Sequence, residues 1–162
     1  MSAVVSLGAN LGDRMARLRG GLEVLAQHVA VRAVSPVYET APVGGVDQPA
    51  YLNAIAILDT DDPETVFAGA QAAECSQGRL RSLRWGPRTL DVDVITVDAV
   101  VTDDPRLTLP HPRAHERGFV LVPWLAIDPT AALPGLGSVR ALLAALPPQG
   151  VNRFADALPI PR

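Results

Sequence analysis

The spacing of apolar and polar residues predicts two helices in the first half of the chain. The first is expected over 13–27, where apolar residues recur at the spacing of one helix face. That stripe consists of Met15, Leu18, Leu22 and Leu25. The second is expected over 63–77, because Asp62 is a good N-cap, Pro63 suits the first helical position, and Gly78 can end the helix in the left-handed conformation.

Runs of β-branched and apolar residues predict strands around these helices. The strands are expected over 3–7, 29–39, 51–58 and 90–97. The run at 29–39 contains Pro36, which cannot donate a hydrogen bond to a neighbouring strand, so it is expected at a sheet edge or ending in a bulge. The run at 51–58 is mostly apolar on both of its alternating faces and is therefore expected to be central.

The order of these elements indicates a fold class. Strand, helix, two strands, helix and strand form the βαββαβ order of ferredoxin-like α+β folds, in which helices cover one face of a largely antiparallel sheet. Beyond this core, helical and hairpin additions are expected. They are a hairpin or excursion over 98–109, a helix over 113–127 interrupted near Pro123, and a short helix over 139–146. The residues after about 147 are expected to form a poorly defined tail.

The composition mainly excludes classes of protein and of mechanism. The 162 residues are 48% hydrophobic and 19% charged, which predicts a globular chain forming a single domain over 1–162. The longest apolar stretch, 119–127, is far shorter than the roughly 20 residues that span a membrane. No export signal is recognised at the N-terminus, so the protein is expected in the cytoplasm. A formal net charge of −3 argues against general nucleic-acid binding. All 14 basic residues are arginine, which excludes mechanisms that need a lysine.

The sequence LDVDVI at 90–95 is the strongest local candidate for a site. Asp91 and Asp93 alternate with apolar residues on a predicted strand, so both project from the same face. Two like charges at the end of a buried strand are costly without a cation, and Mg²⁺ prefers carboxylate and phosphate oxygens. We therefore expect a divalent metal, although a solvated strand end is the alternative for so short a motif.

Arginines crowd the segment just before this pair. Arg79, Arg81, Arg84 and Arg88 all lie there. Guanidinium groups bind phosphate oxygens in a bidentate manner, so the arrangement favours a polyphosphate ligand, with a triphosphate as the natural candidate. Trp85 belongs to the same segment and is a candidate lid that excludes water. The alternative is an exposed basic loop balanced by acidic neighbours.

Aromatic and amide side chains form a second candidate group. Tyr51 and Asn53 share one face of a predicted strand, and Phe119 can supply an opposing plane. An aromatic plane beside an amide suits a flat heterocycle, although Tyr51 taken alone fits the core better than a site. His111 and His115 have the spacing of a helical zinc pair, but Pro112 places His111 at or before the helix start, which favours an anion there instead.

Four blocks of sequence stand out when they are taken together. They are SLGANLGDR at 6–14, YETAPVGGVDQPAYLNA at 38–54, GRLRSLRWGPRTLDVDVI at 78–95 and LPHPRAHERGFVLVPW at 109–124. In order and spacing they resemble the 6-hydroxymethyl-7,8-dihydropterin pyrophosphokinase family of folate biosynthesis. The resemblance implies a ferredoxin-like fold, ATP as donor and two Mg²⁺ ions as cofactor. It also implies that the β,γ-diphosphate is transferred to the pterin hydroxymethyl group with release of AMP.

The resemblance also implies roles for individual residues. Asp91 and Asp93 are similar to the aspartates that hold both magnesium ions, and the implied catalytic set adds Arg79 and Arg88 to them. The implied pterin site consists of Thr40, Pro42, Val43, Tyr51, Asn53 and Phe119. The implied ATP site consists of Gln71, Glu74, Arg79, Arg81, Trp85, Arg88, His111 and Arg117. No nucleic-acid, membrane or obligate protein partner is implied, and a monomer is expected.

Two other functions stay open from the residues alone. Domains of βαββαβ order also bind single-stranded RNA on their sheets, although the acidic net charge and the lack of an aromatic-rich strand weigh against this reading. Two-metal phosphate hydrolysis would use water as the acceptor in place of a pterin. It would release phosphate or pyrophosphate from ATP alone.

Overall fold

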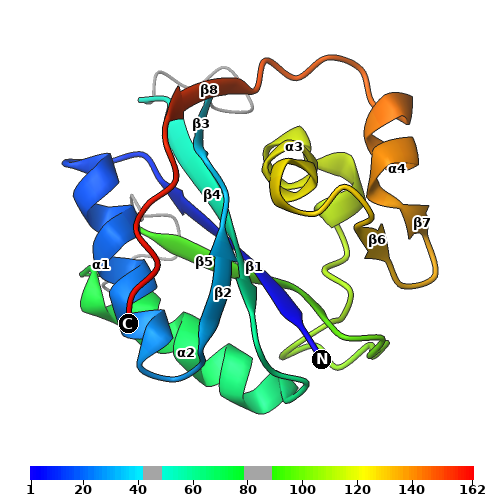
Figure 1. The fold of residues 1–162 in the computed structure, drawn as a ribbon, viewed down its shortest axis with the longest axis horizontal. Coiled ribbons are helices and arrows are strands. Elements are labelled where there is room, and N and C mark those ends of the chain that lie inside the picture. The colour runs from blue at the N-terminus through cyan, green and yellow to red at the C-terminus, as the bar shows by residue number, and fades with distance from the viewer. Residues whose placement is uncertain (42–48, 79–88) are drawn as a thin grey trace.

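The computed structural model describes residues 1–41, 49–78 and 89–162, and Figure 1 shows their arrangement. The helices are α1 (Arg14–Ala26), α2 (Pro63–Ser76), α3 (Gly118–Ile127) and α4 (Val139–Ala145), with a 3-10 turn η1 at Ala114–Glu116. The strands are β1 (Ala3–Ala9), β2 (Val31–Val34), β3 (Val37–Thr40), β4 (Tyr51–Leu58), β5 (Asp91–Val97), β6 (Ala132–Leu133), β7 (Gly137–Ser138) and β8 (Asn152–Ala155).

One antiparallel sheet organises the described residues. Strands β5, β1, β4, β3 and β8 lie side by side in that order, and β2 also pairs with β4. Every pairing is antiparallel. The central position predicted for 51–58 is confirmed, because β4 pairs with β1 on one side and with β2 and β3 on the other. With its helices, the chain has a mixed α/β fold built on an antiparallel sheet.

The two faces of the sheet carry different helices. Side chains of successive strand residues point to opposite faces, so each strand contributes to two cores. On one face, Leu7 and Leu52 belong to the same core as the apolar stripes of α1 and α2. On the other, Ile55 and Ile95 belong to a core with Trp124 of α3. Figure 1 shows α1 and α2 on one side of the sheet and α3 and α4 on the other.

The capping residues predicted for the second helix are confirmed. The Asp62 carboxylate accepts a hydrogen bond from the backbone N–H of Glu64 at 3.1 Å, and Pro63 begins α2. The Thr65 hydroxyl donates to the same carboxylate, and this hydrogen bond is the main reason that the pKa of Asp62 lies below its ordinary value. Just beyond the helix, Gly78 has a φ of 83°, the left-handed conformation that glycine adopts readily.

The strand predicted over 29–39, at a sheet edge or ending in a bulge, is not one continuous strand. The structure divides the run into β2 and β3, with Ser35 and Pro36 between them. The Ser35 hydroxyl accepts a hydrogen bond from the backbone N–H of Ile55 at 2.8 Å and donates to the carbonyl of Pro36 at 2.8 Å. The backbone N–H of Ser35 also donates to the Ile55 carbonyl at 2.8 Å, so Ser35 connects the run to β4 beside Pro36, which has no N–H to donate. The edge position is confirmed for β2, which pairs with β4 alone among the described strands, but not for β3, which lies between β4 and β8.

The tail predicted after about 147 is also more ordered than expected. β8 joins the sheet beside β3, and Leu158 is buried in the core under α1 and α2. Gln149 holds the connection to α3: its side-chain oxygen accepts from the Gly118 backbone N–H at 2.7 Å, and its side-chain nitrogen donates to the Glu116 carbonyl at 2.9 Å. The four residues of β8 are mostly exposed, so they carry no apolar pattern that would have predicted a strand.

The helix predicted over 113–127 is interrupted at a different place. The break lies at Arg117, between η1 and α3, while Pro123 is inside α3. Proline in a helix interior removes a backbone hydrogen bond, and α3 forms around Pro123 with Leu121 and Trp124 buried in the core. The excursion predicted over 98–109 is confirmed by a bridge between Thr102 and Leu109. None of the described helices is long and apolar enough to cross a membrane.

Candidate active site

Polar side chains gather at one end of the sheet face that carries α3. In the strand register, Gly8 of β1 lies opposite Asp91 of β5 on one side and opposite Asn53 of β4 on the other. Thr40, the last residue of β3, lies opposite Tyr51, the first residue of β4. The candidate metal ligands on β5 and the candidate heterocycle residues on β4 therefore lie on the two strands that flank β1, and at this level β1 contributes only Gly8, which has no side chain.

The two aspartates of β5 share one face, as the alternation predicts. Val92 and Val94 pack into the core beneath α1 and α2, so Asp91 and Asp93 project on the opposite side. The side chain of Asp93 is 40% exposed, and its Oδ2 lies 3.2 Å from Nη1 of Arg117. Two carboxylates at a partly exposed strand end suit a divalent cation that also binds ligand phosphates.

Arg117 connects the carboxylates with the aromatic group. Its guanidinium forms the ion pair with Asp93 and also lies over the ring of Phe119, with 5.5 Å to the ring centroid. Arg117 occupies this position because it lies in the break between η1 and α3, where the chain turns beside β5. The structure therefore brings together residues that the sequence assigned to the metal, nucleotide and pterin groups.

His111 precedes η1 and is held beside β5. Its backbone N–H donates to the carbonyl of Ile95 at 2.8 Å, and its Nδ1 accepts from the backbone N–H of Arg113 at 3.2 Å. Burial lowers the pKa of His111, and nearby Arg117 and Arg113 add to this effect, while Asp93 opposes it. The lowered pKa favours the neutral ring, and because Nδ1 accepts a hydrogen bond, the neutral ring places its hydrogen on Nε2, where it can donate to an anion.

The amide of Asn53 is buried and fixed in orientation. The residue is 3% exposed, and its side-chain Nδ2 donates to the Thr40 hydroxyl at 2.9 Å. A Cβ atom on Gly8 would lie 3.0 Å from the Asn53 amide oxygen, so any larger residue here would press on the Asn53 side chain. The role of Gly8 is not evident from the sequence, where it only interrupts an apolar run.

Glu74 is buried on α2 and contacts the strand that carries the aspartates. Its Oε1 accepts a hydrogen bond from the backbone N–H of Val92 at 2.9 Å. Val92 lies between Asp91 and Asp93, so this bond fixes the strand at the candidate metal site. The structure thus adds a positioning contact that sequence reasoning missed. Gln71, the other nucleotide candidate on α2, is exposed.

Several predicted site residues fall outside the described ranges. They are Pro42 and Val43 of the pterin group, and Arg79, Arg81, Arg84, Trp85 and Arg88 of the arginine-rich segment.

Among residues 1–41, 49–78 and 89–162, no group of three or more His, Cys, Asp or Glu side chains is placed to hold a metal ion. A zinc site at His111 and His115 therefore has no support there. The Asp91 and Asp93 pair fits Mg²⁺, which commonly uses one or two carboxylates together with phosphate oxygens and water.

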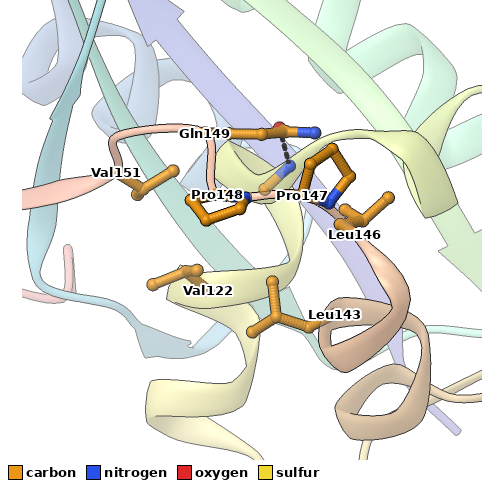
Figure 2. A pocket seen from close by; sticks show the side chains of 8 residues that line it. Val122, Leu143, Leu146, Pro147, Pro148, Gln149 and Val151 are labelled. Carbon is orange, nitrogen blue, oxygen red and sulfur yellow. Dashed lines mark hydrogen bonds between the residues drawn. The ribbon is translucent and has the colours of Figure 1, made fainter.

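A cavity of about 250 Å³ lies elsewhere, between α3, α4 and the segment leading to β8 (Figure 2). Most of its lining is apolar, including Val122, Leu143 and Val151. Gln149 also lines the cavity, and its side-chain amide forms hydrogen bonds with the backbone of Gly118 and Glu116. None of the predicted site residues lines this cavity, so it is separate from the candidate active site.

Comparison with known proteins decides the family. The model of the 7,8-dihydro-6-hydroxymethylpterin-pyrophosphokinase (HPPK) family matches residues 4–129. The chain belongs to the HPPK family. The 2-amino-4-hydroxy-6-hydroxymethyldihydropteridine pyrophosphokinase of Mycobacterium tuberculosis is 48% identical over 159 residues, covering 90% of this chain and 84% of that protein. The protein of the same name from Pseudomonas aeruginosa is 40% identical over 156 residues, covering 94% and 96%.

Solved HPPK structures share the fold of this chain. A crystal structure of an HPPK-DHPS in complex with substrates matches with a TM-score of 0.68 at 10% identity, covering 89% of this chain and 43% of that one. Wild-type Plasmodium falciparum HPPK-DHPS with pteroate matches with a TM-score of 0.66 at 13% identity, covering 88% and 42%. At such low identity the likeness shows the fold alone, and this chain spans less than half of either fused protein.

Proposed function

We propose that this HPPK-family chain transfers the β,γ-diphosphate of ATP to the hydroxymethyl oxygen of 6-hydroxymethyl-7,8-dihydropterin and releases AMP. The family match over residues 4–129 and the curated relatives support a pterin pyrophosphokinase of folate biosynthesis. The observation that carries the proposal for this site is the position of Asp91 and Asn53 on either side of Gly8. The alternative of a nucleic-acid-binding module has no support in the comparisons.

Asp91 and Asp93 are the proposed ligands of two Mg²⁺ ions. Their carboxylates lie on one strand face, and Glu74 fixes the strand between them through Val92. When bound, Mg²⁺ supplies positive charge that stabilises the diphosphate and lowers the pKa of the acceptor hydroxyl. Holding the metal ligands on a strand that is also anchored to α2 keeps their geometry constant, which favours catalysis.

The proposed pterin site lies across Gly8 from these carboxylates. Tyr51 and Phe119 would contact the two faces of the ring, and Asn53 would bind its polar edge. The hydrogen bond to Thr40 leaves one amide hydrogen and the amide oxygen of Asn53 to recognise a ring that presents both donors and acceptors. Pro42 and Val43 complete the proposed lining.

The residues proposed to bind the nucleotide include several arginines. Arg117 and His111 lie beside Asp93, where they would contact the phosphates of ATP. The other proposed contacts to the nucleotide are Gln71, Glu74, Arg79, Arg81, Trp85 and Arg88, with Arg79 and Arg88 in the catalytic set. Arginine is suited to this role, because its planar group binds phosphate oxygens in a bidentate manner.

The proposed transfer is an in-line displacement at the β-phosphorus. The hydroxymethyl oxygen forms a bond to this phosphorus while the bond to the oxygen bridging the α- and β-phosphates breaks. The bonding electrons leave with AMP, and the hydroxyl proton passes from the acceptor oxygen to water. Asn53 and the aromatic pair would orient the acceptor, and the arginines would stabilise the charge of the transferred group.

Pterin dependence of AMP formation tests this function. Purified protein is incubated with ATP and Mg²⁺, with and without 6-hydroxymethyl-7,8-dihydropterin, and the nucleotides are separated by chromatography. We expect AMP only when the pterin is present. Phosphate or pyrophosphate release from ATP alone would instead indicate hydrolysis, and ADP would indicate transfer of a single phosphoryl group.

Glu74→Leu is expected to lower both stability and turnover, whereas Glu74→Gln keeps both close to wild type. Leucine leaves the buried N–H of Val92 without its acceptor, which costs about 1–3 kcal/mol of unfolding free energy, while glutamine retains an acceptor oxygen. Urea unfolding and steady-state kinetics measure the two effects. If Glu74→Leu raised only the KM for ATP and left stability unchanged, Glu74 would act as a nucleotide contact and not as a support for β5.

We further propose a ferredoxin-like description of the fold, a single domain over 1–162 and a monomer in solution. The strand order β5-β1-β4-β3, with α1 and α2 on the same face, supports the fold description. The burial of Leu158 in the main core supports one domain that includes the C-terminal residues. Light scattering coupled to gel filtration measures the mass in solution, and the expected value is that of one chain.

A further inference from the structure

Arg14 is the last residue of the SLGANLGDR block, and the proposed function assigns it no part. It is also the first residue of α1. Its Nη1 donates to Oε2 of Glu39 on β3 at 2.8 Å and to the carbonyl oxygen of Ala50, just before β4, at 2.9 Å. One guanidinium nitrogen therefore joins the helix to the ends of two neighbouring strands.

These strand ends are the ones that carry the proposed pterin residues. Glu39 pairs with Leu52, and the next pair in the ladder is Thr40 with Tyr51. Leu52 is buried in the core under α1 and α2, whereas Asn53 contacts Thr40 on the opposite face. Arg14 therefore contacts β3 and β4 on the side of the sheet covered by α1 and α2, opposite the face on which the proposed pterin residues lie.

The surroundings of Arg14 hold its guanidinium in place. The side chain is 24% exposed, compared with 49% for Arg32 in the pair that it forms with Asp59. The guanidinium also lies over the ring of Phe154 on β8, with 5.3 Å to the ring centroid. A partly buried arginine with a carboxylate, a carbonyl and an aromatic partner has little freedom to move, so its contacts restrain the elements that they join.

We propose that Arg14 is a positioning residue for the pterin site, which it supports without touching the substrate. By holding Glu39 and Ala50 together, it keeps the terminal Thr40–Tyr51 pair closed, and the Thr40 hydroxyl in turn orients the Asn53 amide. Ends of strand ladders open readily when they lack side-chain support. This inference rests on the proposed function, because it assumes that Tyr51 and Asn53 bind the pterin.

Arg14→Gln is the main test, with Arg32→Gln as a matched control. Arg32 also pairs with a carboxylate and a backbone carbonyl, those of Asp59 and Met1, but it lies on β2, whose partner is the other end of β4. For Arg14→Gln we expect the KM for pterin to rise about tenfold and the KM for ATP to change less than about twofold. Arg32→Gln is expected to change neither value. Arg14→Lys, which keeps the charge, is expected to restore part of the pterin affinity.

Hydrogen exchange gives a second measurement that does not need activity. In Arg14→Gln, backbone amides in 38–40 and 51–53 are expected to exchange faster than in wild type, while those of β1 and β5 keep their rates. If Arg14→Gln does not fold, Glu39→Gln is measured in its place. It removes the ion pair but leaves the hydrogen bond from Arg14 to Ala50.

The results separate this inference from the proposed function. A wild-type chain that forms no AMP in the presence of pterin would contradict the proposed function. A wild-type chain that is active, with a pterin KM that is unchanged in Arg14→Gln, would overturn the positioning role. Equal rises in the KM for both substrates would overturn it as well, because they would indicate a general loss of structure.

Discussion

Asp93→Asn is expected to reduce diphosphate transfer by about 10³-fold or more, mainly through kcat. The neutral amide is a poor ligand for a divalent cation. The substitution also removes the carboxylate that pairs with Arg117 at 3.2 Å. The fold is expected to survive, because the Asp93 side chain is 40% exposed and such pairs contribute only about 0–1 kcal/mol. Single-turnover kinetics and thermal unfolding measure these two effects separately.

Asp59→Asn is the matched control for this substitution. Asp59 also pairs with an arginine, Arg32, and its side chain is 49% exposed, but it lies just beyond the other end of β4. We expect Asp59→Asn to keep wild-type turnover. The assignment of Asp93 to the metal would be wrong if Asp93→Asn kept more than about a tenth of wild-type turnover at saturating Mg²⁺.

Asn53→Ala is expected to raise the KM for pterin by about 100-fold and to change the KM for ATP little. A site built to hydrogen-bond a polar ring binds poorly once one of its buried polar groups is removed. The same change leaves the Thr40 hydroxyl without the amide that now donates to it, so unfolding free energy is expected to fall by about 1–3 kcal/mol. Steady-state kinetics with each substrate varied in turn, together with urea unfolding, measure both effects.

Thr96→Val provides a comparison for Asn53→Ala at another buried polar position. Thr96 is 5% exposed and lies opposite Val4, at the other end of β5 from the aspartates. Its replacement is expected to leave the KM for pterin unchanged. If Asn53→Ala raised the KM for ATP as much as that for pterin, Asn53 would not be specific to the pterin side of the site.

The face shared by Asp91 and Asp93, and that shared by Tyr51 and Asn53, could be predicted because side chains alternate strictly along a strand. The sequence does not predict how these strands are placed relative to one another. The position of Gly8 between Asp91 and Asn53 depends on the pairing of three strands that are far apart in the chain. The central place of β4 was predictable only because it is apolar on both faces.

Contacts between segments far apart in the chain could not be predicted from the sequence around each residue. Arg14 reaches Glu39 across 25 residues and Ala50 across 36, and nothing in its immediate sequence indicates either partner. Glu74 has the composition of an ordinary helix residue, and only the packing of α2 on β5 shows that it accepts a hydrogen bond from Val92. β8 was missed for a related reason, since its pairing with β3 and not its own apolar content makes it a strand.

The proposed transfer is tested most directly by identifying both products of one reaction. Wild-type chain is incubated with ATP, Mg²⁺ and 6-hydroxymethyl-7,8-dihydropterin, and the pterin and nucleotide products are quantified by mass spectrometry, with Asp93→Asn in parallel. We expect AMP and a pterin carrying a diphosphate in equal amounts from wild type, and neither product above background from the variant. A pterin monophosphate with ADP, or free pyrophosphate with unmodified pterin, would contradict it.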